Sequence, residues 1–240
     1  EAQWKDKQNG FNNPTSQKSW IWCLTYTSDD DAVKGQLYNW MNQMSTETNM
    51  DSYSHWDSNV KMIDAHLYSQ IPTTDWRRES WVSPTNEYPV NSDSPVKDKI
   101  PAYTNIKFRP GQGNYTDYLV AHAISIPLMR MEEMMLIEAE AAGRQTLANG
   151  IMLLETFGKL RNPAYTSTAT KLSDFIDEIW LQKRIELWGE GQAIFDIKRL
   201  NKGITRSYTG TNHPVGYRFN TEKQPYWMDY VIVQTEGDNN

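Results

Sequence analysis

The chain has 240 residues, a length at which one large domain, or one domain with an appendage, is expected. Its 24 basic and 30 acidic residues give a net charge of −6. This acidic balance disfavours nucleic acid as the main partner, because a phosphate backbone selects basic surfaces. The sequence contains no run of about 18 apolar residues, so it predicts no membrane-spanning helix. The single Cys23 excludes an internal disulfide framework and a multi-cysteine metal site.

Residues 1–125 are predicted to be loop-rich, with short strands and a few helices. Helical periodicity is weak in this segment, and turn signals built on Pro, Gly and Asn recur along it. The apolar run Trp20–Leu24 predicts a buried strand. Helices are expected around Val33–Met44 and Val60–Ser69. The chain begins at Glu1 without a signal-peptide pattern, so we expect any export signal to lie outside it or to have been removed.

Residues 126–205 differ, because apolar side chains recur there at three- and four-residue steps. Gly143 is the expected end of the first helix, and Ser173 is the expected N-cap of the third. Antiparallel helix pairs joined by short turns are typical of helical-repeat scaffolds. The similarity in sequence between the predicted pairs is too weak to establish a repeat. Residues 206–240 form a third, irregular segment. The four predicted helices cover Leu128–Gly143, Ala148–Leu160, Ser173–Gly189 and Ala193–Leu200.

A pair of carboxylates lies in the stretch QKRIELWGEGQAIFDIKR, residues 182–199. Glu186 and Glu190 are four residues apart, so an unbroken helix would place both on one face, as general acid/base chemistry could require. Gly189 and Gly191, however, flank Glu190, and glycine commonly ends a helix in the left-handed conformation. The chain is therefore expected to turn between the two carboxylates.

We favour a structural role for both carboxylates. Glu190 precedes the fourth predicted helix, where a negative charge faces the positive end of the helix dipole. Glu186 is expected to pair with Lys183 or Gln182 on its own helix. Helix-end electrostatics of this kind is more common than a catalytic pair.

Other patterns that carry chemistry are absent from the sequence. The four histidines show no H-x-x-x-H or H-E-x-x-H spacing, and Asp29–Asp31 lacks the spacing and the glycine of an EF-hand loop. There is no G-x-S-x-G nucleophile motif and no phosphate-binding glycine motif. We therefore expect no cofactor, no metal and no catalysis, and a cation at Asp29–Asp31 stays open as the alternative.

Aromatic residues are the best candidates for binding a ligand. The chain has ten tryptophans and thirteen tyrosines, and their rings combine a flat apolar face with a polar edge. One group lies within seventeen residues that also contain Asn and Asp, and a second lies beside prolines in a turn-rich segment. Core packing remains the alternative for each ring. The candidate ligand-binding residues are Trp40, Tyr53 and Trp56 in the first group and Trp81 and Tyr88 in the second.

The stretch 182–199 resembles the late signature of the SusD/RagB family of surface lipoproteins from Bacteroidetes, E-R-R-x-E-L-x-x-E-G-H-R-x-x-D-L-x-R. The chain departs from it at Gln182-Lys183 and Gln192-Ala193. Upstream, IPLMRMEEMMLIEAEA, GKLRNPA and DWRRESW are similar to further segments of the family, in the family's order. The late signature matches at Arg184, Glu186, Leu187, Glu190, Gly191, Asp196 and, in charge, at Lys198 or Arg199.

This resemblance implies a mostly α, SusD-like fold in which TPR-like helix pairs join a loop-rich segment with short strands. It implies that the E-G signature holds a helix-turn-helix against the scaffold. It also implies non-catalytic binding of glycans or other nutrients at the extracellular face of the outer membrane, with delivery to a SusC-like TonB-dependent transporter. Family members are longer, so we expect a lipid anchor outside this chain and the protein's own N-terminal half as a further partner.

Two other functions stay open at this point. A glycoside hydrolase would use two of the thirty acidic residues as carboxylates facing each other across a groove. A helical-repeat scaffold would bind only other proteins.

Overall fold

The computed structural model describes residues 11, 17–34, 44–45, 60–85, 87, 98 and 100–229. The chain forms two units, residues 1–190 and 191–240. Its described part is mostly helical with a small two-stranded sheet, as expected from the sequence. None of the helices in this part combines the length and the apolar composition needed to cross a bilayer.

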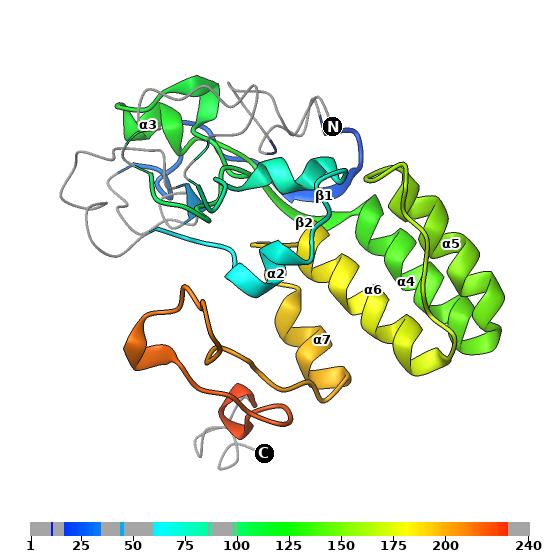
Figure 1. Ribbon diagram of the computed structural model, residues 1–240. Coiled ribbons are helices and arrows are strands. Elements are labelled where there is room, and N and C mark those ends of the chain that lie inside the picture. The colour runs from blue at the N-terminus through cyan, green and yellow to red at the C-terminus, as the bar shows by residue number, and fades with distance from the viewer. Residues whose placement is uncertain are drawn as a thin grey trace, which may run out of the picture. The chain divides into compact units, whose positions relative to one another are not determined.

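The sheet consists of strand β1 (Trp20–Leu24) and strand β2 (Ile126–Arg130), which pair antiparallel with Trp22 opposite Met129 (Figure 1). The strand predicted at Trp20–Leu24 is confirmed, but its predicted burial is wrong. Ile21 is 50% exposed and Trp22 is 61% exposed. Two strands alone cannot enclose their own side chains, so the sheet leaves apolar residues at the surface of the first unit.

Strand β2 replaces the first turn of a predicted helix. The sequence predicts a helix from Leu128, whereas helix α4 covers Met131–Gln145 and the residues before it are extended. Pro127 disfavours helical geometry in the residue before it, and the ladder to β1 supplies backbone hydrogen bonds in place of a helix. Helix α4 also continues past Gly143, so the helix end predicted there is wrong.

Gly143 allows close packing instead. Helices α4, α5 (Leu147–Lys159) and α6 (Leu172–Glu186) lie side by side (Figure 1). A Cβ atom on Gly143 would lie 2.2 Å from the Phe175 ring, and one on Gly150 would lie 2.4 Å from the Cα of Gly143. Glycine therefore lets these helices approach one another. Their fully buried apolar residues include Leu136, Ala139, Leu154, Phe157, Phe175 and Ile179.

The first half of the chain contains short elements. Helix α2 (Ala65–Ser69) is shorter than the predicted helix Val60–Ser69, and Asp64 caps it by accepting a hydrogen bond from the Leu67 amide at 2.8 Å. Most of the helix predicted at Val33–Met44 lies outside the described residues. Within the described residues, this half also contains the 3-10 helices η2 (Trp76–Ser80) and η4 (Gly111–Gly113) and the helix α3 (Tyr118–Ala121).

A hydrophobic cluster joins this half to helix α6. Ile185 near the end of α6 packs against buried residues of the segment around α2. Burial of such side chains is the main force holding the loop-rich segment on the helices. The cluster contains Ile63, Leu67, Tyr68, Ile71, Trp81 and Ile185.

The second unit begins with helix α7 (Ala193–Arg199), which confirms the helix predicted there. Its remaining described residues are irregular. An antiparallel bridge joins Thr205 to Asn220. The 3-10 turns η5 (Val215–Tyr217) and η6 (Tyr226–Met228) each follow a proline.

Candidate functional site

One of the five predicted ligand-binding aromatics lies in the described part of the chain. Trp40, Tyr53, Trp56 and Tyr88 lie outside the described residues and stay predictions. Trp81 is described, and its side chain belongs to the hydrophobic cluster on α6.

Trp81 is a core residue, so its prediction as an exposed platform is wrong. It is 1% exposed, and its ring meets that of Trp188 edge to face, with centroids 5.9 Å apart and planes at 87°. Its backbone also forms an antiparallel bridge with Asn105. The polar, turn-rich sequence around Trp81 suggests exposure, but these contacts from distant segments bury the ring.

The turn predicted between Glu186 and Glu190 is present. Helix α6 ends at Glu186, and Gly189 and Gly191 adopt φ angles of 78° and 83°, in the left-handed region that glycine favours. A side chain on Gly189 would meet Phe108 at 2.5 Å. The glycine thus serves both the turn and the close approach of the segment around Phe108.

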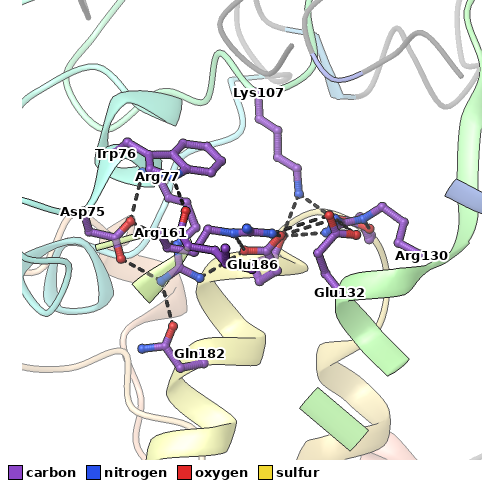
Figure 2. Close-up of polar contacts among 11 residues, drawn as sticks. Asp75, Trp76, Arg77, Lys107, Arg130, Glu132, Arg161, Gln182 and Glu186 are labelled. Atoms are coloured by element: carbon purple, nitrogen blue, oxygen red, sulfur yellow. Dashed lines mark hydrogen bonds and ion pairs between the residues drawn. The ribbon is translucent and has the colours of Figure 1, made fainter. Parts of the chain in front are cut away.

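The two carboxylates belong to a buried ion cluster, centred on Glu186 in Figure 2. We define this cluster as four basic and four acidic side chains, so its formal charges balance. Glu186 is 0% exposed, and most of the other members are also buried. The members are Arg77, Lys107, Arg130 and Arg161 with Asp75, Glu132, Glu186 and Glu190.

Glu186 binds arginines from three separate segments. Arg161 donates from Nε to Oε2 at 3.0 Å and from a terminal nitrogen to Oε1 at 3.1 Å. Arg77 of η2 donates to Oε2 at 3.1 Å, and Arg130 of β2 donates to Oε1 at 3.3 Å. These partners of Glu186 thus come from outside its own helix, and Arg77 also donates to Gln182 at 2.7 Å. The expected pairing of Glu186 with Lys183 or Gln182 stays a prediction.

Glu190 completes the cluster on the other side of the turn. Arg130 holds both of its carboxylate oxygens, at 2.7 and 2.8 Å, in a bidentate pair. The buried Lys107 donates to Glu190 at 2.5 Å and to the carbonyl oxygens of Glu186 and Trp188 at 3.1 and 2.9 Å. The Glu190 carboxylate thus joins β2 and the Lys107 segment to the end of α6.

The charges in this cluster shift pKa values in defined directions. Burial alone would raise the pKa of Glu186, but Arg161, Arg130 and Arg77 outweigh it and hold that pKa well below its ordinary value. Burial lowers the pKa of Lys107 to about 8, against the attraction of Glu190. The pKa of Arg130 is raised, because the charges of Glu190 and Glu186 outweigh its desolvation.

The geometry of the ion cluster fits a structural role rather than a catalytic one. A general acid needs a carboxyl group with a raised pKa within reach of a substrate, whereas Glu186 is fully buried with a lowered pKa. The cluster instead ties α6 to β2, to η2 and to the segments of Lys107 and Arg161. Over the described ranges, no three His, Cys, Asp or Glu side chains gather in a way that could hold a metal ion.

We expect this cluster to make the protein sensitive to acid. Because folding lowers the pKa of Glu186, its ionisation stabilises the fold above the ordinary value of 4.5, and this stabilisation is lost as the pH falls below 4.5. Urea unfolding at pH 7 and pH 3 should show a larger loss for the natural protein than for Glu186→Gln. Equal losses in the two proteins would contradict the assignment.

Sequence reasoning missed several residues that the structure brings forward. Arg77 and Arg161 lie in DWRRESW and GKLRNPA, so the resemblance contains a signal for them, but it does not show that both meet Glu186. Lys107 has no comparable signal. Exposed aromatics in the described residues were also missed, namely Trp22, Phe195, Tyr217, Tyr226 and Trp227.

Comparison with known proteins gives one family. The model of the SusD family matches residues 4–240. No curated protein matches the chain. The structure is similar to a SusD-like carbohydrate binding protein from Bacteroides vulgatus ATCC 8482, with a TM-score of 0.63 and 25% identity, over 93% of this chain and 43% of that chain.

A SusD superfamily protein from Bacteroides thetaiotaomicron VPI-5482 is similar in fold, with a TM-score of 0.55 and 17% identity. That match covers 85% of this chain and 44% of the other. The chain therefore spans less than half the length of these two solved proteins.

Proposed function

Because the chain belongs to the SusD family, we propose that it binds glycans or other nutrients without changing them chemically. The observation that carries this proposal is the similarity, over 93% of the chain, to a SusD-like protein described as carbohydrate binding. The chain spans only part of that protein, so its ligand and its partners are part of the proposal.

The ion cluster supports a binding role over hydrolysis. A glycoside hydrolase needs two carboxyl groups facing the substrate, one of them with a raised pKa. Glu186 and Glu190, four residues apart in the late signature, are the carboxylates considered above for acid/base chemistry. Both are held by buried arginines. Their charges are therefore used within the scaffold.

We place the ligand on the aromatic group Trp40, Tyr53 and Trp56, with Tyr88 as a second element. A sugar ring needs a flat apolar face beneath it and polar groups at its edge. The sequence supplies both within a short segment, because Asn42 and Asp57 lie close to the rings along the chain.

The proposed setting is the extracellular face of the outer membrane. There the protein, anchored by a lipid on a segment outside this chain, delivers its ligand to a SusC-like TonB-dependent transporter. Because family members are longer than this chain, we also propose an N-terminal half, outside this chain, as a partner. Exposed apolar residues on β1 and β2, such as Ile21, Trp22 and Met129, support a further covering segment.

Replacing Trp40 or Trp56 with Ala is expected to weaken binding of a cognate oligosaccharide by about 1–3 kcal/mol, as for other aromatic anchors. Isothermal titration calorimetry on the folded variants measures this loss. Tyr217→Ala is the control, because Tyr217 is an exposed aromatic in a different segment. Unaltered affinity in both tryptophan variants would move the ligand site away from this group.

A further inference from the structure

The second unit carries two exposed aromatic rings on one short 3-10 turn. Tyr226 is 87% exposed and Trp227 is 54% exposed. Both lie on the 3-10 turn η6, directly after Pro225, whose ring restricts the backbone. Large aromatic side chains are costly to leave in water, so such exposure calls for an explanation.

The ring of Trp227 is held in place by its neighbours. It meets the Phe219 ring edge to face, with centroids 6.4 Å apart and planes at 79°. The guanidinium of Arg206 lies 5.1 Å over the other ring of this pair, Phe219. Phe219 and Arg206 are joined in turn by a backbone hydrogen bond at 3.0 Å, beside the bridge of Thr205 and Asn220. Trp227 is therefore oriented before any ligand arrives, which reduces the entropy cost of binding.

Polar side chains close the same turn at its two ends. Gln224 donates from Nε2 to Oδ1 of Asp229 at 2.7 Å, across the residues that carry the two rings. Lys198 of α7 also contacts Oδ1 of Asp229, at 3.2 Å. Oδ2 of Asp229 and Oε1 of Gln224 retain the capacity to accept hydrogen bonds from hydroxyl groups.

We propose that η6 is a second sugar-stacking site, in which Trp227 and Tyr226 receive a pyranose ring and Gln224 and Asp229 bind its hydroxyls. The C–H face of a pyranose matches a flat aromatic ring, and its hydroxyls match the amide and the carboxylate at the ends of the turn. The site is small, and exposed polar residues such as Lys223 flank it, which favours a sugar over a protein partner. The ligand class rests on the proposed function, whereas the site is separate from the Trp40 group.

Fluorine NMR of the full chain labelled with 5-fluorotryptophan tests this site directly. The signals of Trp227, Trp40, Trp56 and Trp22 are assigned from single Trp→Phe variants. Cellohexaose, laminarihexaose, maltohexaose and xylohexaose are the probes. Sorbitol is the control, because it carries hydroxyls but no ring face. The Trp227 signal is expected to shift saturably with at least one probe and to stay in place with sorbitol, while the Trp22 signal stays in place with both.

The outcomes separate the two proposals. Saturable shifts of Trp227 support the second site, whether or not Trp40 and Trp56 respond. Shifts of Trp40 or Trp56 with an unmoved Trp227 signal support the proposed function and overturn the second site. Signals that move equally with sorbitol, or that move with none of the probes, overturn both.

Discussion

Replacing Glu186 with Gln is expected to lower the free energy of unfolding by about 3–5 kcal/mol, the usual cost of removing one partner from a buried ion pair. Gln keeps the size of the side chain but removes the negative charge. Arg77, Arg130 and Arg161 then remain buried with one positive charge uncompensated. Helix-end electrostatics alone would cost only about 1 kcal/mol. Urea denaturation of the two proteins at pH 7 measures the difference.

The matched control is Asp174→Asn on the same helix. Its carboxylate pairs with Lys171 at 3.6 Å, and both side chains are well exposed, so the loss should be below about 1 kcal/mol. A Glu186→Gln loss no larger than that of the control would show that the cluster contributes little. The folded Glu186→Gln protein should still bind glycan, because Glu186 is fully buried and its carboxylate is held by three arginines.

Replacing Gly189 with Ala is expected to lower the free energy of unfolding by about 2–5 kcal/mol. The left-handed backbone costs an Ala roughly 1–2 kcal/mol, and its φ of 78° is in that region. The added Cβ would also lie 2.5 Å from Phe108 and 2.6 Å from Met44, which adds an overpacking cost of about 1–3 kcal/mol. Thermal and urea unfolding measure the sum of these effects.

Gly191→Ala separates the two contributions to this loss. Gly191 has a similar φ of 83°, but a Cβ there meets no heavy atom within 4 Å. Its variant should therefore lose only the backbone part, about 1–2 kcal/mol. Equal losses at the two glycines would mean that the contact with Phe108 adds nothing.

Local sequence patterns predict helices α5 and α7 well. Helix α5 matches its predicted range within one residue at each end, and α7 ends one residue before its predicted end. These helices depend on side chains three and four residues apart. Strand β2 is different, because its partner β1 lies about a hundred residues earlier in the chain. The helical period after Pro127 continues into α4 and conceals the strand.

In the candidate sites, too, the sequence predicts features that depend on neighbouring residues and misses those that depend on distant contacts. The glycines around Glu190 predict a turn, and the turn is present. The partners of Glu186, however, lie 109, 56 and 25 residues away, so no local pattern reveals them. Trp81 is misplaced for a related reason, since its burial depends on Trp188 and Asn105. For Trp227, the adjacent rings after Pro225 in a polar segment are a usable local signal.

A glycan-array screen of the purified chain, followed by counting reducing ends after incubation with each bound glycan, tests the central claim most directly. Our account predicts binding to at least one class of glycan with no increase in reducing ends. New reducing ends, or an array on which no glycan is bound, would contradict it.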